Sequence, residues 1–68
     1  MEYIKYDKQD DGSVSVVYTV DGTRYRKGFT IGDDVELKAF KLPVDVYNEI
    51  TNDIWTDEAR ITRKAFND

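Results

Sequence analysis

Carboxylates are the most numerous residues in this chain that can take part in chemistry. The sequence contains 14 acidic and 10 basic residues, and it has neither histidine nor cysteine. Two carboxylates held about 5–10 Å apart can hydrolyse a glycosidic bond. The adjacent acid pairs are Asp10/Asp11, Asp33/Asp34 and Asp57/Glu58. Each pair falls where a turn or a helix start favours acids for structural reasons, so we expect a protein that is not an enzyme.

Nucleophilic catalysis lacks its usual partners in this sequence. The only serines are Ser13 and Ser15, both within an expected strand. Without histidine or cysteine there is no general base of the usual triad kind to activate a hydroxyl, and no thiol nucleophile. The absence of cysteine also removes disulfides and thiolate metal sites. We therefore predict no catalytic residues and no cofactor.

The stretch that begins at Asp7 matches the first half of a calcium-binding loop. Oxygen-bearing side chains stand at its first, third and fifth positions, the latter two being Gln9 and Asp11, and Gly12 is sixth. The twelfth position, which supplies a bidentate carboxylate in such loops, is Tyr18. The expected flanks are also strands rather than helices. We interpret this stretch as an aspartate-rich turn, with no metal site.

The element around which the chain is organised is a β-hairpin over residues 13–31. Two runs rich in β-branched and aromatic residues flank Asp21-Gly22, which is the strongest local signal for a type I′ turn. A two-residue turn places one set of side chains on the core face: Val14, Val16, Tyr18, Val20, Thr23, Tyr25 and Phe29. The same register puts Lys27 opposite Val16. We therefore expect a β-bulge around Lys27-Gly28 that turns the ammonium out to solvent. A type I turn with a bulge at Gly22 is the alternative, and it would shift this register.

Elements on either side of the hairpin complete the predicted fold. Residues 2–7 read as a first strand with Ile4 and Tyr6 facing the core, whereas residues 35–42 fit a short helix or a fourth strand. For the helix, Asp33 starts a capping-box pattern. The result is an α+β fold: a small antiparallel β-meander of three or four strands with one or two α-helices packed on one face. Residues 1–68 form a single domain of this kind.

The second half of the chain predicts helices. Apolar residues recur with helical spacing over residues 45–55, and Asp45 is the expected cap. Trp55 fits either a core position or an exposed anchor. A further helix restarts near residues 56–58 and runs through Ala65.

Composition also predicts where the protein acts. The chain has no cysteine, and charged residues are scattered through its first twenty positions, which argues against the apolar stretch of a signal peptide. No apolar run approaches the length that spans a bilayer. We expect a cytoplasmic protein that does not enter a membrane.

Our leading hypothesis is a small acidic binding module that regulates or inhibits a host protein, one that handles nucleic acid. The chain carries a net charge of −4, and without catalytic groups it acts by covering a partner. The predicted protein-binding residues are Glu49, Asp53, Asp57, Glu58 and Trp55. In size, charge and layout the chain is similar to small phage-encoded inhibitors of DNA-binding enzymes. That similarity implies a phage or mobile-element origin.

Nucleic-acid binding is the alternative function. Arg24 and Arg26 alternate on one face of the predicted hairpin, and Lys27 joins them if the bulge forms. From Gly12 to Phe40 the chain resembles the arm-binding domains of phage-type integrases, with a strand, an Asp-Gly turn, a basic strand ending in Lys-Gly-Phe-Thr, and then a helix. This resemblance implies a three-stranded sheet that reads DNA. Those domains are basic, whereas this chain is acidic.

Self-association is a further expectation. A meander leaves two sheet edges open, and the alternating charges of residues 2–7 can pair antiparallel with their own copy. We therefore predict a homodimer through the first strand, with Tyr3 or Tyr6 buried and with Trp55 adding contact area.

Overall fold

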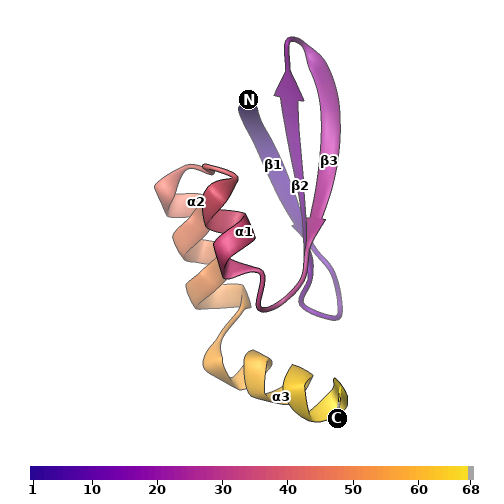
Figure 1. The fold of residues 1–68 in the computed structure, drawn as a ribbon, viewed down its shortest axis with the longest axis vertical. Helices are drawn as coiled ribbons and strands as arrows, with labels where there is room; N and C mark the ends of the chain where they lie inside the picture. The colour runs from indigo at the N-terminus through magenta and orange to yellow at the C-terminus, as the bar shows by residue number, and fades with distance from the viewer. Residues whose placement is uncertain (68) are drawn as a thin grey trace.

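The computed structural model describes the backbone of residues 1–67 and the side chains of residues 1–62. Its elements are β1 (Glu2–Lys8), β2 (Val14–Val20), β3 (Thr23–Phe29), α1 (Asp34–Ala39), α2 (Val44–Glu49), the π-helical turn η1 (Ile50–Ile54) and α3 (Asp57–Asn67). The strands form an antiparallel sheet in the order β1-β2-β3 (Figure 1). The predicted α+β fold with a three-stranded meander is confirmed, and residues 35–42 contribute a helix rather than a fourth strand.

The hairpin of β2 and β3 has the predicted turn and register. Asp21 and Gly22 both have positive φ, 51° and 82°, as a type I′ turn requires. Pairing continues without a shift from Val20 opposite Thr23 to Val14 opposite Phe29. The expected bulge at Lys27-Gly28 is therefore wrong.

Lys27 keeps its place on the core side of the sheet because β3 is an edge strand. It pairs with Val16, and its Nζ lies 5.6 Å from the centre of the Phe29 ring. The residue is exposed, so the ammonium reaches water while it lies over an aromatic face. No bulge is needed to release the charge.

The irregularity in the sheet lies in β1 instead. The register between β1 and β2 shifts between Tyr3 and Lys5, so that Tyr3 pairs with Tyr18 and Tyr6 pairs with Val16. The extra residue allows Tyr3 and Tyr6 both to face the core side, although they are three positions apart. Ile4, which we expected to face the core, is 39% exposed. Tyr3 takes that inward place.

The core lies between the sheet and the first helices. Its buried residues are Val14, Val16, Phe29, Leu37, Leu42, Ile50 and Trp55. In α1, helical spacing brings Leu37 and Phe40 to the same side, whereas a strand would direct them to opposite faces. The Phe40 ring packs edge-on against Tyr18 and Phe29, at centroid distances of 4.8 and 5.5 Å. These contacts favour the helix over the fourth strand.

The helix starts differ in detail from the predicted caps. Asp33 is the N-cap of α1, but its carboxylate accepts hydrogen bonds from the backbone and hydroxyl of Thr30, at 2.9 and 3.1 Å, and none from the helix. The capping-box pattern therefore marks the helix start without forming the predicted bond. α2 begins directly after Pro43, so Asp45 lies in its first turn and is not the cap.

The π-helical turn η1 sets the position of Trp55. The Trp55 amide donates to the Ile50 carbonyl at 2.8 Å, and the wider turn brings Ile50, Ile54 and Trp55 toward the core together. Trp55 is fully buried, and its Nε1 donates to the Gly12 carbonyl at 2.8 Å. The alternative of Trp55 as an exposed anchor, and its predicted part in a partner or dimer interface, are therefore wrong.

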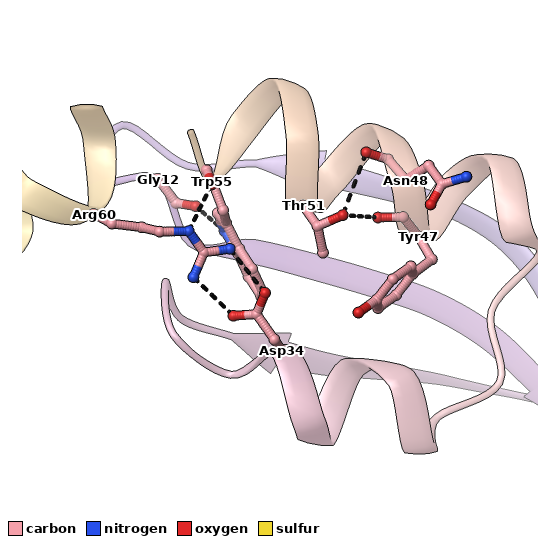
Figure 2. Close-up of polar contacts among 7 residues, drawn as sticks. All are labelled: Gly12, Asp34, Tyr47, Asn48, Thr51, Trp55 and Arg60. Carbon is pink, nitrogen blue, oxygen red and sulfur yellow. Dashed lines mark hydrogen bonds and ion pairs between the residues drawn. The ribbon is translucent and has the colours of Figure 1, made fainter. Parts of the chain in front are cut away.

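Arg60 attaches α3 to the rest of the molecule. Its Nη1 and Nη2 donate to the two carboxylate oxygens of Asp34 at 2.9 and 2.8 Å, and its Nε donates to the Trp55 carbonyl at 2.8 Å (Figure 2). The Thr56 hydroxyl caps the helix start by accepting from the Ala59 amide at 3.2 Å. α3 lies beyond the end of the sheet (Figure 1), and among the side chains that the structure describes, Arg60 links it to α1.

Replacing Trp55 by Phe tests the central role of the indole. We expect Trp55→Phe to lower the free energy of unfolding by about 2 kcal/mol, because it leaves a cavity and removes the bond to the Gly12 carbonyl. Urea unfolding measures the change. Circular dichroism follows it in place of tryptophan fluorescence, because Trp55 is the single tryptophan. Val35→Ala, at a position exposed on α1, is the control. If the two variants are equally stable, the Trp55 indole does not have the central role in stability that we assign to it.

The ion pair of Asp34 and Arg60 predicts a pH dependence. The hydrogen bonds from Arg60 lower the pKa of Asp34 below its ordinary value of 3.8. The pair therefore stabilises the fold above that value, and its contribution is lost as pH falls through the lowered pKa. Both side chains are about one-third exposed, 36% and 32%, so we expect Asp34→Asn to cost only about 0.5–1 kcal/mol at neutral pH.

Chemical denaturation across the acid range checks this prediction. The stability difference between the native sequence and Asp34→Asn should shrink toward zero at low pH. Glu36→Gln, which removes an exposed acid from the same helix, should show no comparable trend. A difference that stays constant with pH argues against the ion pair as its cause.

Candidate functional site

Three acidic residues form the most distinctive surface feature of the helical half. Asp45, Glu49 and Asp53 stand four residues apart along α2 and η1, and all three are exposed. We call these residues the acidic strip. Residues 44–54 contain no lysine or arginine to offset them.

The acidic strip weakens the helix that carries it. Like charges four residues apart repel each other across a helical turn, by about 0.2–0.5 kcal/mol per pair. Asp53 also lies near the helix end where the backbone dipole favours a cation. Asp45, in the first turn of α2, suits the helix dipole, whereas the repulsion between the acids and the position of Asp53 oppose helix formation.

Two tyrosines of β1 border the acidic strip. The Tyr6 hydroxyl donates to Glu49 Oε1 at 2.5 Å. Burial and this hydrogen bond raise the pKa of Tyr6 to about 12, and the nearby charge of Asp53 adds to the shift. Burial, followed by the charges of Glu49 and Asp45, also raises the pKa of Tyr3. Both shifts favour the neutral phenol, and the Tyr6 hydroxyl donates to the acidic strip.

The four acids predicted as a binding surface belong to different helices. Glu49 and Asp53 belong to the acidic strip, whereas Asp57 and Glu58 are in the first turn of α3. Asp57 lines a shallow depression beside Arg60, and Glu58 lines a separate groove. The break in the helix after Ile54 separates the two pairs.

Asp45 is the member of the acidic strip that sequence reasoning missed. It was assigned to helix capping, although its spacing of four from Glu49 and eight from Asp53 was visible in the sequence. Pro43 takes the cap position instead and leaves the Asp45 carboxylate on the exposed side of the first turn. Repetition of one charge sign at helical spacing was the signal that identifies it.

The groove beside Glu58 lies between the β1–β2 turn and the start of α3. It has a volume of about 650 Å³, with Ile31 and Ile54 among its apolar residues and Lys8 and Asp10 among its charged ones. Among the residues that the structure describes, no three acids, histidines or cysteines converge as a metal site would require. The groove is therefore lined by apolar residues and by charged residues of both signs.

The basic residues of the alternative function are divided between two faces of the sheet. Arg24 and Arg26 lie on the outer face, whereas Lys27 lies on the core side. Arg26 Nη1 is 3.2 Å from Asp7 Oδ2, and Lys5 Nζ is 4.0 Å from the same oxygen. The predicted basic stripe therefore loses Lys27 and is partly neutralised by Asp7.

Comparisons with known proteins add no family to this picture. No protein-family model matches the chain, and neither a curated protein nor a solved structure matches it. None of the helices in the described part of the chain has both the length and the apolar character that crossing a bilayer demands.

Removal of the Tyr6 hydroxyl tests the coupling between β1 and the acidic strip. The pKa of Tyr6 is higher in the folded state than in the unfolded state. The stabilisation from the bond to Glu49 is therefore fully present below about pH 10, and it is lost as the pH rises through about 12. We expect Tyr6→Phe to cost about 1 kcal/mol at neutral pH.

Ultraviolet titration of the tyrosines provides the second measurement. The step that titrates at the highest pH should disappear in Tyr6→Phe. It should persist in Tyr25→Phe, because Tyr25 is on β3, the strand farthest from β1. If both variants retain that step, the Tyr6–Glu49 bond does not govern it.

Proposed function

We propose that this protein is a small non-enzymatic binding module that acts inside the cell and inhibits or regulates a host protein through the acidic strip. The observation that carries the proposal is the exposed row of Asp45, Glu49 and Asp53 beside Tyr3 and Tyr6. A phage or mobile-element protein of this kind needs only a surface complementary to its target.

The charge of the acidic strip indicates the chemistry of the partner. A row of carboxylates attracts a surface rich in lysine and arginine, and such surfaces are typical of proteins that bind nucleic-acid phosphates. Charge complementarity steers the encounter and selects the partner. We therefore propose a nucleic-acid-handling protein whose phosphate-binding surface the strip covers.

The tyrosines beside the acidic strip add buried area and directional hydrogen bonds to the attraction between charges. Tyrosine is enriched among residues that dominate binding energy, because its ring buries area and its hydroxyl forms directional bonds. Tyr3 and Tyr6 are partly buried in the free protein, so they are already ordered before a partner arrives. A pre-ordered aromatic border lowers the entropy lost on binding.

Neutralising the acidic strip tests the proposed function. We expect Glu49→Gln combined with Asp53→Asn to weaken binding about tenfold, because the substitutions remove two negative charges from a charged interface. The matched control is Asp57→Asn combined with Glu58→Gln, which makes the same chemical change on α3 and should alter affinity by less than about twofold. Both variants have the same net charge.

Affinity capture from host lysate identifies the partner, and titration of that purified partner measures the dissociation constants. A nucleic acid that the partner binds should compete with the native protein for it. Equal weakening by the two variants rejects the acidic strip as the interface. A partner that binds nucleic acid and this protein simultaneously argues against coverage of its phosphate-binding surface.

Nucleic-acid binding by this protein is the second candidate function. It has one favourable observation: Arg24 and Arg26 project from the same exposed face of a three-stranded sheet. If these side chains contact phosphates, binding of duplex DNA weakens steeply with salt and with Arg24→Ala and Arg26→Ala. No binding at low salt rejects this function.

The homodimer through β1 remains a prediction. Its contact area cannot include Trp55, which is buried. The irregularity between Tyr3 and Lys5 also interrupts the edge that would pair with a second copy.

A further inference from the structure

The outer edge of β3 is the longest regular edge that the sheet leaves open. β3 is the last strand of the sheet, and its residues from Thr23 to Gly28 are all exposed. In Figure 1 it runs along the side of the sheet away from α1 and α2. The opposite edge, β1, is irregular and borders the acidic strip.

The hairpin turn determines which backbone groups of β3 face outward. In a two-residue type I′ hairpin the residues that flank the turn, Val20 and Thr23, form a hydrogen-bonded pair, and bonded pairs then alternate with non-bonded ones. Thr23, Tyr25, Lys27 and Phe29 therefore bond to β2. Arg24, Arg26 and Gly28 direct their N–H and C=O groups away from the sheet, where another strand can pair with them.

Side chains next to this edge carry two different chemistries. Arg24 and Arg26 lie on the outer face of the sheet. Tyr25 lies on the other face, is 47% exposed, and stacks on Tyr18 with a centroid distance of 5.6 Å. A strand added at this edge would thus meet the side chains of Arg24 and Arg26 on one side, although Arg26 also donates to Asp7 of β1 at 3.2 Å. It would meet an aromatic ring on the other side.

We propose that the edge of β3 binds an extended acidic segment of a partner protein as a fourth strand. Its acidic residues lie opposite Arg24 and Arg26, and an apolar residue between them lies beside Tyr25. Backbone pairing supplies affinity in this mode of recognition, and the alternate side chains supply specificity. This surface is separate from the acidic strip and does not depend on the proposed function.

Charge excludes the simplest competing occupant. A second copy of β3 would bring Arg24, Arg26 and Lys27 against the same three cations, and like charges opposite each other destabilise strand pairing. An acidic strand removes that repulsion. The regular edge of β3 therefore favours a partner of opposite charge over a second copy of itself.

Hydrogen exchange measured by NMR tests the proposal with a defined probe. The probe is a blocked octapeptide of alternating Glu and Val, and the controls are its Lys-Val counterpart and a Glu-Val peptide interrupted by Pro. In the free protein the amides of Arg24, Arg26 and Gly28 should exchange fast, whereas those of Tyr25 and Lys27 should be protected. Saturating Glu-Val peptide should slow exchange at the first three amides by about tenfold or more, and neither control peptide should.

A matched pair of variants separates strand pairing from simple charge attraction. Gly28→Pro removes an outward N–H without removing a charge or a bond to β2, so peptide affinity should fall about tenfold or more. Gly28→Ala retains that N–H, and an added Cβ has no heavy atom within 4 Å, so its affinity should stay within about twofold. Circular dichroism verifies that both variants fold.

Arg24→Ala combined with Arg26→Ala gives an independent measurement. It leaves the backbone groups in place but should weaken the peptide complex and reduce its dependence on salt. The proposal is overturned if saturating peptide leaves the three outward amides unprotected, or if Gly28→Pro and Gly28→Ala bind equally well. It is also overturned if duplex DNA, and not the acidic peptide, perturbs these residues.

Discussion

The hydrogen bond between the Trp55 indole and the Gly12 carbonyl is the contact on which the arrangement of the two halves depends. It joins the β1–β2 turn to the end of η1 across 43 positions of sequence. Gly12 suits this turn: its φ is +88°, a conformation that residues with side chains rarely adopt, and a Cβ there would lie 2.7 Å from Ile31 Cδ1. The Trp55 carbonyl in turn accepts from Arg60, which carries the connection on to α3 and α1.

The direction of the acidic strip follows from this buried contact. Because Ile50 and Trp55 are fixed in the core, the opposite side of α2 and η1 must face solvent. Such a surface needs polar residues, but it does not require a row of one charge sign. Neutral residues would repel one another less, and a cation in place of Asp53 would suit the end of the helix dipole better. The first-turn position accounts for Asp45 and the bond from Tyr6 accounts for Glu49 within the fold, but neither requires the repetition of one charge sign along the helix.

Local signals were predictable from the sequence, and contacts between distant segments were not. The Asp21-Gly22 turn fixed the hairpin register because a type I′ turn depends on a few adjacent residues. The irregularity in β1 between Tyr3 and Lys5 and the bond from Tyr6 to Glu49, 43 positions away, are not contained in any local pattern. Of the predicted binding residues, Glu49 and Asp53 lie on the acidic strip with Asp45, which was assigned to a cap, whereas Asp57 and Glu58 belong to α3.

The two edges of the sheet carry charges of opposite sign. The acidic strip borders β1, and the arginines lie on β3 at the other edge. Between them Asp7 pairs with Arg26 and approaches Lys5, so charges within the sheet partly balance above the buried Val17. If the strip of one copy met the arginines of the next, the contact would join unlike surfaces and would propagate without closing. Internal pairing of Arg26 with Asp7 reduces the positive charge that any acidic partner meets at this edge, whether a second copy or another protein. Recognition at the β3 edge therefore depends on backbone pairing as well as on charge.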